Sequence, residues 1–509
     1  MNRDGATLSI WQDNIKNFDE DGIKVLSMTY DIAIVGGGIT GITTALELQK
    51  LGFNCLVLEA QTLGFGSTSG TTAHLNTIIE ISYDEIEKQF GEESAKLVLQ
   101  STLDAINLIK TNQEKYNIDC DFLERKGYQF ATNEHQSKML DANYEASIKA
   151  GCRVSYANEI PLNIPFTKAL VFEDQAQFHP TKYLLGIANV FVKNGGTILQ
   201  NCRVTGVEKK DDNVLKIETS KGSFLAKNLV YATHTPPGVN ILHFRCAPYR
   251  TYVMGFTLKD GNYPDSLVYD LDEPYRYYRT QEIDGKKYLI AGGEDHKTGE
   301  ESDTEQPYKN LEAYMRRYFN IDEITYRWSS QYFQSADGLA YIGHLPGNPE
   351  NVYVSTGYSG NGMIFGTIGA IVLSNLIQTG QPAYKDLYNP SRIKPVAGFN
   401  NFVKEAADVV SKLAEKIIGA PKIKEFDEIK TNEGKVVKYE SESIAVYKDK
   451  NGDLHTVSSA CTHIKCNIAW NNTELVWECP CHGSRFTMDG EMITAPARKD
   501  LEKIKFSEK

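Results

Sequence analysis

One segment near the N-terminus, residues 30–59, constrains the fold of this 509-residue chain more than any other. Its parts are an apolar run at residues 30–35, the glycines Gly36, Gly38 and Gly41, helix formers at residues 42–51, and a second apolar run at residues 54–58 that ends at Glu59. This order predicts a strand, a glycine turn, a helix and a second strand. A chance glycine turn is the alternative, and the two strands with the acidic residue argue against it.

The residue types in this segment suit a dinucleotide. Gly36 permits a tight turn, Gly38 lets the backbone approach a pyrophosphate, and Gly41 lets the helix pack closely on the strand. The helix N-terminus, where Thr40 lies, offers unpaired N–H groups to phosphates. Glu59 can accept hydrogen bonds from a ribose. The sequence therefore predicts a Rossmann-type dinucleotide-binding domain.

Four residues near the C-terminus have the spacing of metal ligands. Cys461 and His463 form a C-x-H motif, and after fifteen residues Cys479 and His482 form a C-x-x-H motif. Two thiolates can hold one iron and two imidazoles the other, which is the mixed ligation of a Rieske [2Fe–2S] centre. A zinc site is the alternative, since two cysteines and two histidines also suit zinc. Zinc fingers usually pair like residues in one loop, whereas each loop here supplies one of each, which favours iron.

The two ligand loops resemble those of the Rieske proteins of cytochrome bc complexes. In that family a second cysteine in each loop forms a disulfide, which implies a bond between Cys466 and Cys481. Ser484 matches a serine that bonds a bridging sulfide, but Phe486 stands where high-potential members carry a tyrosine. Fewer hydrogen bonds to sulfur imply a reduction potential below that of those members and above that of plant-type ferredoxins. Residues 495–497 resemble the proline loop that covers the cluster.

Three further segments resemble flavin-contacting segments of the D-amino acid oxidase and glycine oxidase superfamily. They are a strand at residues 229–233 that contains Ala232, a loop at residues 58–72 that contains Thr68, Thr71 and Thr72, and a late glycine-rich loop that contains Gly360, Asn361, Gly362 and Met363. The resemblance implies FAD as the cofactor, and it adds Val204 to the implied FAD site. One Rossmann fingerprint leaves no separate NAD site beside FAD.

His74 follows the second of these segments. Residues 70–74 resemble the Gly-Ser-Thr-Trp-His segment of dimethylglycine dehydrogenases, in which the histidine is covalently joined to the 8α-methyl group of the flavin. Ala73 stands in place of the tryptophan here. Two alternatives stay open, a covalent link and an ordinary hydrogen-bonded histidine beside the isoalloxazine.

The resemblance also implies the architecture: an α/β plus β chain, with a glutathione-reductase-type FAD-binding Rossmann domain interleaved with an antiparallel-sheet substrate domain, followed by a small all-β Rieske domain. The expected parts are an N-terminal extension at 1–27, an oxidoreductase at 28–385, a linker at 386–421 and the Rieske domain at 422–509. Within the oxidoreductase, the FAD-binding segments are expected at about 28–80, 175–240 and 335–385. The substrate-domain segments are expected at about 81–174 and 241–334. The linker should hold an amphipathic helix whose apolar stripe is Phe402, Ala406, Val409, Leu413 and Ile417.

In the resembled oxidases an amine or amino acid binds over the flavin and transfers a hydride to it. Arginines and tyrosines of the sheet that roofs the flavin often hold a substrate carboxylate there. The candidates in this chain are Arg250, Tyr252, Tyr277 and Arg279, with a structural sheet face as the alternative. His296 and Lys297 are further catalytic candidates, because a charged cluster in an otherwise apolar region needs a partner.

Two redox sites in one chain predict a flavoprotein oxidoreductase in which a small amine or amino acid reduces FAD and the iron–sulfur cluster transfers electrons singly to an external acceptor. A reductase that runs from an external donor through the cluster to the flavin, and a redox-sensing interaction protein, are the alternatives. A net charge of −12 argues against nucleic acid as a partner. No apolar stretch is expected to be long enough to span a bilayer, and the first residues lack a signal-peptide core, which predicts a cytoplasmic protein.

Overall fold

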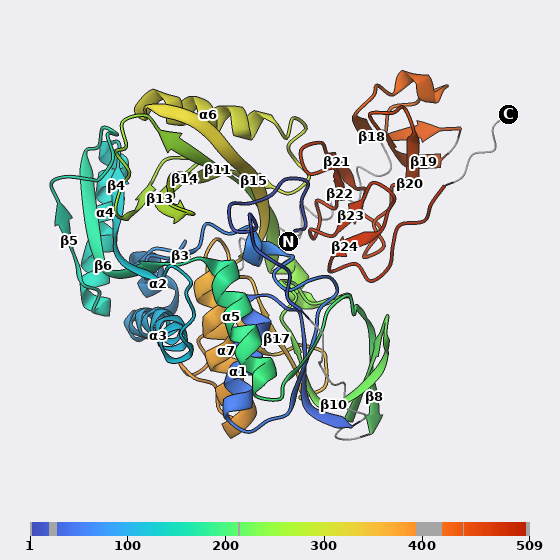
Figure 1. Cartoon of the computed structure of the whole chain (residues 1–509), viewed down its shortest axis with the longest axis horizontal. Helices are drawn as coiled ribbons and strands as arrows, with labels where there is room; N and C mark the ends of the chain where they lie inside the picture. The colour runs from blue at the N-terminus through green and yellow to red at the C-terminus, as the bar shows by residue number, and fades with distance from the viewer. Residues whose placement is uncertain (1–2, 20–27, 212–213, 393–419, 441, 505–509) are drawn as a thin grey trace.

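The structure is a computed structural model that describes residues 3–19, 28–211, 214–392, 420–440 and 442–504 (Figure 1). Among these residues the main strands form four sheets, of eight, nine, three and four strands. The first two sheets build the body of the molecule, and the last two build a separate C-terminal domain (Figure 1). The amphipathic helix predicted for the linker lies outside the described residues.

The eight-stranded sheet carries the fingerprint segment. Its path is β16-β17-β10-β1-β2-β7, and the hairpin of β8 and β9 extends from β10. β1 pairs in parallel with both β2 and β10, as in a doubly wound fold. The strands are β1 Thr29–Val35, β2 Cys55–Leu58, β7 Thr197–Leu199, β8 Val204–Asp211, β9 Val214–Thr219, β10 Gly222–Tyr231, β16 Tyr341–His344 and β17 Val352–Thr356.

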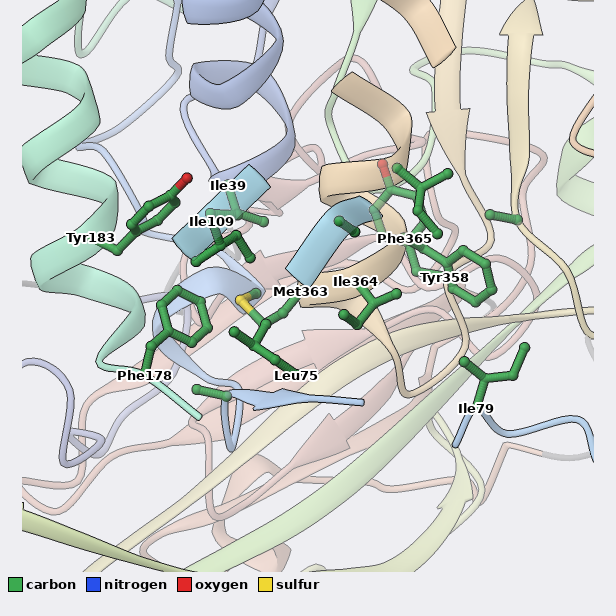
Figure 2. Packing of buried hydrophobic residues seen from close by; sticks show 14 of the residues in the cluster. Ile39, Leu75, Ile79, Ile109, Phe178, Tyr183, Tyr358, Met363, Ile364 and Phe365 are labelled. Carbon is green, nitrogen blue, oxygen red and sulfur yellow. The ribbon is translucent and has the colours of Figure 1, made fainter. Parts of the chain in front are cut away.

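A layer of helices packs against this sheet. It consists of α1 (Ile39–Lys50), α3 (Glu92–Tyr116), α5 (Pro180–Lys193) and α7 (Gly362–Thr379). Figure 2 shows how Ile39, Ile109, Tyr183 and Phe365, one from each helix, share one apolar core. Burial of such side chains is the main force that holds helix and sheet together.

Helix α7 corrects one expectation about membrane spans. By length and composition it could cross a bilayer, although 67% of its apolar window is buried inside the protein. Its contacts with α1 and α3 explain its composition, because a helix covered on several sides is apolar all round. The expectation that no apolar stretch reaches this length was wrong.

The nine-stranded sheet is mainly antiparallel, with the path β15-β11-β14-β13-β12-β4-β6-β3 and with β5 beside β6. Helices α4 (Glu134–Ala150) and α6 (Gln306–Tyr318) pack on it. Together with the eight-stranded sheet it confirms the predicted interleaved architecture. The strands are β3 His74–Leu75, β4 Leu123–Ala131, β5 Val154–Ala157, β6 Lys168–Gln177, β11 Cys246–Leu258, β12 Leu267–Asp270, β13 Arg276–Ile283, β14 Lys286–Lys297 and β15 Ile321–Ser335.

Two elements differ from the expected segment boundaries. β3 joins the nine-stranded sheet, where His74 lies opposite Gln177, although residues 28–80 were assigned to the FAD-binding part. Residues 83–116, which fall in an expected substrate-domain segment, form α2 (Tyr83–Phe90) and α3, and α3 packs on α7 and α5 and only slightly on β6 of the substrate sheet. An apolar stripe predicts that a helix is covered but does not say which layer covers it.

The C-terminal domain contains two small antiparallel sheets, as predicted for an all-β unit. One is formed by β18 (Glu433–Tyr439), β19 (Glu442–Lys448) and β20 (Leu454–Ser458), and the other by β21 (Ala469–Asn471), β22 (Val476–Glu478), β23 (Arg485–Thr487) and β24 (Met492–Thr494). Figure 1 shows the four-stranded sheet on the side of β15 and the three-stranded sheet farther out. The ligand-bearing sheet is therefore the one nearer the body.

Candidate cofactor cavity and metal centre

A large cavity, about 950 Å³ in volume, is lined by both large sheets. On one side lie the glycine turn after β1 and the ends of β2 and β10, and on the other side lie residues of β11, β13, β14 and β15. The volume lies in the upper part of the range for small-molecule and cofactor sites. A cavity at the carboxyl ends of parallel strands is where such sheets bind their ligands.

The glycine turn fits a pyrophosphate. A Cβ atom on Gly36 would lie 2.4 Å from the carbonyl oxygen of Ala232, and one on Gly41 would lie 1.9 Å from the carbonyl oxygen of Gly36. Thr68 Oγ1 accepts a hydrogen bond of 3.1 Å from the N–H group of Ile39, the first residue of α1. The backbone at the start of α1 therefore borders the cavity beside the Thr68 hydroxyl, and a helix N-terminus of this kind favours an anion.

Glu59 occupies the position expected of the ribose-binding acid. Its carboxylate accepts hydrogen bonds from the N–H groups of Gly37 at 2.6 Å and Gln61 at 2.8 Å. Burial raises the pKa of Glu59, although these two hydrogen bonds and the charge of Arg203 oppose the shift. The carboxylate is thus fixed at the end of β2, beside the cavity.

The structure brings nearly all of the predicted cofactor-binding residues to this one cavity. The exception is Gly41, which packs beneath the turn. The lining residues are Gly36, Gly38, Thr40, Glu59, Thr68, Thr71, Thr72, His74, Val204, Ala232, Gly360, Asn361, Gly362 and Met363. The glycine cradle, the fixed acid and the late glycine loop fit FAD.

His74 has partners for both ring nitrogens. Nδ1 lies 3.0 Å from Thr72 Oγ1, and Nε2 lies 3.4 Å from the carbonyl oxygen of Tyr278. Burial, helped by the charge of Arg279, lowers the pKa of His74 to about 3, so the ring is neutral. A ring engaged on both sides favours the non-covalent alternative for this histidine.

The predicted catalytic residues divide into two groups. Tyr277 and His296 line the cavity, whereas Arg250, Tyr252, Arg279 and Lys297 do not. On β11 it is Thr251 that lines the cavity, because successive side chains of a strand point to opposite faces. Tyr252 is fully buried behind the wall, with its Oη 2.9 Å from His296 Nε2. Tyr252 therefore positions His296 and does not face the cavity.

Both arginines that were expected to hold a substrate carboxylate are bound elsewhere, so that prediction is corrected. Arg250 is fully buried and forms an ion pair with Glu478 of the C-terminal domain. Arg279 is also fully buried, and it donates hydrogen bonds to the carbonyl oxygens of Thr72 at 3.0 Å and Ala73 at 2.8 Å. Arg279 thus fixes the loop before His74.

Sequence reasoning missed an acidic, tyrosine-rich part of the cavity wall. Its main members are Glu80, Tyr269, Tyr275, Asp295 and Tyr332. The segment that predicted His296 and Lys297 also contains Asp295, so a signal for that residue was present. Glu80 lies in no recognisable motif, and only the fold places it beside Gly360 and Asn361.

The metal-binding loops have the arrangement that the resemblance implied. Cys466 and Cys481 form a disulfide, and Cys461 and Cys479 are buried free thiols. The sulfurs of Cys466, Cys479 and Cys481 lie within 4.8 Å of one another. That closeness reflects the disulfide, whose sulfurs cannot act as thiolate ligands, so it does not indicate a separate three-cysteine metal site.

The four expected ligands fit a Rieske cluster. Both ring nitrogens of His482 are buried and have no hydrogen-bond partner among the described residues, as expected of a ligand whose partner is a metal. Burial lowers the pKa of His482 to about 3 and that of His463 to about 4, so both rings are neutral, as metal ligands must be. A hydrogen bond from the Cys479 thiol lowers the pKa of Cys461, which shows that the two thiols adjoin.

The metal centre and the cavity adjoin each other. Six residues of the C-terminal domain line the cavity: Met492, Ile493, Thr494, Ala495, Ala497 and Arg498. From the body, the Gly238 N–H group donates a hydrogen bond of 2.8 Å to the carbonyl oxygen of Pro496. His243, in the short helix η2 (Ile241–Phe244), has its ring centroid 4.9 Å from that of His463 and 5.8 Å from that of His482.

A buried cluster of charges joins the C-terminal domain to the body. It contains three arginines and three acids, each at most 5% exposed: Arg3, Asp4, Arg250, Glu474, Glu478 and Arg485. Arg485 pairs with Asp4 at 2.7 Å, and Arg3 pairs with Glu474 at 3.6 Å. Burial alone would raise the pKa of Glu474, but the charges of Arg3, Arg250 and Arg485 outweigh it and hold that pKa below its usual value.

Comparisons with known proteins agree with this geometry. The FAD dependent oxidoreductase family matches residues 31–376, and the Rieske [2Fe-2S] domain matches residues 420–505, which favours iron over zinc. The Rieske 2Fe-2S iron-sulfur protein YhfW of Bacillus subtilis is 32% identical over 476 residues, which cover 93% of each chain. Gamma-glutamylputrescine oxidoreductase of Escherichia coli is 26% identical over 372 residues, 69% of this chain and 84% of that protein. Glycine oxidase from Geobacillus kaustophilus shares the fold, with a TM-score of 0.61, 19% identity, and coverage of 72% of this chain and 100% of that one.

Proposed function

Because the chain belongs to the family of FAD-dependent oxidoreductases and ends in a Rieske domain, we propose that it oxidises a small amine or amino acid and passes the electrons through its own cluster to an external acceptor. Its cofactors are FAD, which supplies hydride chemistry, and a [2Fe–2S] cluster, which carries single electrons. The relative named gamma-glutamylputrescine oxidoreductase and the fold neighbour named glycine oxidase support an amine or amino acid as the substrate.

One observation carries the proposal: the cavity that fits FAD is walled in part by the domain that holds the cluster. Residues 492–495, 497 and 498 belong to that wall. The segment after β10 runs from Ala232, at the cavity, to His243, which contacts both ligand histidines. Two redox sites that share a wall in one chain are suited to exchange electrons directly.

The chain's own residues have distinct parts in this proposal. The β1–α1 turn and Glu59 hold the dinucleotide, and Arg279 holds the loop that carries Thr72. His296 is neutral, because burial lowers its pKa, and its nitrogens face Tyr252 Oη and the Lys297 carbonyl oxygen. No nitrogen of His296 is left to take a proton from substrate, so this ring shapes the cavity wall.

The test is anaerobic reduction of the purified holoprotein by a panel of small amines and amino acids. A substrate should bleach the flavin absorbance, and the cluster should then bleach and give a Rieske-type EPR signal. The matched control is Cys479→Ser, which removes a cluster ligand: its flavin should still bleach with substrate, but no EPR signal should appear.

Electron flow in the proposed direction is ruled out if the cluster stays oxidised while the flavin is fully reduced. The reverse direction, from an external donor through the cluster to the flavin, predicts a different order. In that case a one-electron donor reduces the cluster first, the flavin follows, and Cys479→Ser abolishes flavin reduction by that donor.

A further inference from the structure

The charges that line the cavity are divided between its two sides. Only two basic residues other than histidine, Arg203 and Arg498, line it among the described residues. Both lie where the C-terminal domain meets the body. Arg203 of the body donates to the Met492 carbonyl oxygen, and Arg498 of the C-terminal domain donates to the Pro237 carbonyl oxygen, each at 3.0 Å. On the side of the nine-stranded sheet the charged lining is acidic: Glu80, Asp270, Asp272, Glu273, Glu294, Asp295 and Glu301.

Two of these acids are already satisfied by the protein. Glu294 forms an ion pair of 2.6 Å with Arg276. Asp270 accepts hydrogen bonds from the N–H groups of Arg276 at 2.7 Å and Asp272 at 3.3 Å. Glu80 and Asp295 have no ion-pair partner among the described residues, and the hydrogen bonds that they accept come from tyrosine hydroxyl groups.

Glu80 sits at the edge of the late glycine loop. Its N–H group donates to Asn361 Oδ1 at 2.9 Å, and a Cβ atom on Gly360 would lie 2.1 Å from Glu80 Oε1. Oε1 accepts a hydrogen bond of 3.0 Å from Tyr275 Oη. Glu80 is exposed, and its accessible surface borders the cavity, where desolvation by the surrounding protein raises its pKa. The carboxylate therefore lies beside the loop that is expected to meet the flavin.

Asp295 has one oxygen with no hydrogen bond of normal geometry among the described residues, although the Thr251 side chain is near enough to oppose the rise in its pKa. Oδ2 accepts a hydrogen bond of 2.9 Å from Tyr332 Oη, whereas Oδ1 is buried and has no hydrogen-bond partner among the described residues. Burial raises the pKa of Asp295 to about 7, and the charge of Glu80 contributes to the increase. Glu80 is exposed to the cavity and Asp295 is half-buried, and the charge of Glu80 disfavours the charged form of Asp295. A cation bound beside them would stabilise both carboxylates.

Aromatic rings surround this pair of acids. The rings of Tyr275 and Tyr277 are 5.6 Å apart, and the ring of His74 lies 5.8 Å from that of Tyr277 at nearly a right angle. Tyr269 Oη is buried and forms no hydrogen bond of normal geometry in the part of the chain that the structure describes. Tyrosine faces attract cations, and their hydroxyl groups can accept a hydrogen bond from an ammonium group.

We infer that Glu80, Asp295 and the surrounding tyrosines form a site for the ammonium group of an amine substrate that has no carboxylate to be recognised. This inference rests on the proposed amine oxidation and narrows its substrate class. A substrate carboxylate would meet two acids here and no arginine or lysine among the described residues, since Arg250 and Arg279 are bound elsewhere. An α-amino acid is thus disfavoured by charge, and an alkylamine is favoured.

The test compares two dead-end ligands on the oxidised holoprotein. tert-Butylammonium and 2-aminoisobutyrate both carry a primary ammonium group and lack a hydrogen on the adjacent carbon, so neither can transfer a hydride. In 2-aminoisobutyrate, a carboxylate replaces one of the three methyl groups of tert-butylammonium. Binding is followed by the change that each ligand causes in the flavin absorbance spectrum, which needs no turnover.

We expect tert-butylammonium to bind at least about tenfold more tightly than 2-aminoisobutyrate, a difference of about 1.4 kcal/mol. Glu80→Gln and Asp295→Asn should each weaken tert-butylammonium by roughly tenfold or more, since a charge-assisted hydrogen bond is lost. Glu282→Gln is the matched control: it removes the same charge from an exposed position of β13 and should change nothing. FAD content and thermal unfolding show whether each variant is folded.

The cation site is overturned if 2-aminoisobutyrate binds as tightly as tert-butylammonium to the wild-type protein, a comparison that needs no variant. It is also overturned if neither substitution weakens tert-butylammonium. Its failure is distinct from failure of the proposed function. If amino acids but no amines reduce the flavin, the proposed oxidation is supported and the cation site is wrong. If no compound reduces the flavin while tert-butylammonium binds as expected, the proposed oxidation is wrong and the cation site is supported.

Discussion

Asp295 should set the pH dependence of cation binding. The groups that face it are Tyr332 from β15, Thr251 from β11, Glu80 from the loop after β3 and Glu294 on its own strand, and none of them is basic. Its pKa is raised to about 7, mainly by burial. Below that pH the carboxyl is neutral and attracts a cation less, and above it the carboxylate is charged.

We therefore expect the affinity for tert-butylammonium to rise as the pH increases from about 6 to about 8 and then to level off. The rise should approach tenfold per pH unit on the acidic side, and Asp295→Asn should flatten it. Spectral titrations of the flavin at several pH values measure the effect. A wild-type affinity that does not change over this range would contradict the assignment.

Arg279 supports the loop before His74 from outside the cavity. It is buried, has no carboxylate partner among the described residues, and donates to carbonyl oxygens, with the ring of Trp11 5.2 Å away. Arg279→Met should leave the carbonyl groups of Thr72 and Ala73 without donors, at a cost of about 1–3 kcal/mol for each unsatisfied group. We expect FAD to bind at least about tenfold more weakly, as measured by titrating the apoprotein with FAD.

The exposed Arg153 provides the control for this variant, because its ion pair with Asp174 lies on the surface. Arg153→Met should retain FAD as the wild type does. An Arg279→Met protein that binds FAD normally would show that the loop holds its own conformation.

At the scale of single residues, the sequence predicted the cofactor side well and the substrate side poorly. Glycines and ligand pairs act through local spacing, so Gly36 and Cys461 could be assigned from the chain alone. The roles of Arg250 and Thr251 depend on which face of β11 points inward, and the register between β11 and β14 shifts between residues 250 and 252. Glu80 acquires its role only when residues 360 and 361 come beside it.

At the scale of elements, η2 covers the metal centre. His243 donates from Nε2 to the Pro236 carbonyl oxygen at 2.9 Å and accepts at Nδ1 from the Asn240 N–H group at 3.1 Å, so its ring is held against the rings of His463 and His482. This short helix was not predicted, because it has no apolar period of its own. The fingerprint elements β1, α1 and β2, in contrast, were predicted to within a few residues, whereas β10 begins well before the predicted strand at residues 229–233.

His243→Ala should open this cover. Loss of two buried hydrogen bonds and a ring should ease local opening by about 1.4 kcal/mol or more, so iron should be released to a chelator roughly tenfold faster. FAD content should not change. His344→Ala, at an exposed position of β16, is the control. Equal rates of iron release from the two variants would mean that η2 does not protect the centre.

At the scale of the whole molecule, the buried charge cluster fixes the C-terminal domain to the body. Its ion pairs join residues far apart in the chain, such as Arg250 with Glu478 and Asp4 with Arg485. No local sequence pattern indicates such pairs. The docking of the C-terminal domain on the body could therefore not be predicted, although the two parts were each predicted. Glu474, with its lowered pKa, stabilises the cluster at neutral pH, and this contribution is lost as the pH falls through that pKa.

Glu478→Gln should be strongly destabilising, because it leaves Arg250 buried without its carboxylate. Breaking a buried ion pair costs about 3–5 kcal/mol, whereas an exposed pair is worth about 1 kcal/mol or less. The control is Glu124→Gln, which breaks the exposed pair with Lys110. Urea unfolding followed by flavin fluorescence measures both. A Glu478→Gln protein no less stable than Glu124→Gln would mean that Glu474 compensates the charge of Arg250.

The cavity wall draws on residues from position 4 to position 498. A chain that is still being made on the ribosome can therefore fold its glycine turn early but cannot complete the cavity until residue 498 has emerged. By then the four cluster ligands, the last of them His482, have also been made. The order of synthesis thus brings the loading of the two prosthetic groups together in time.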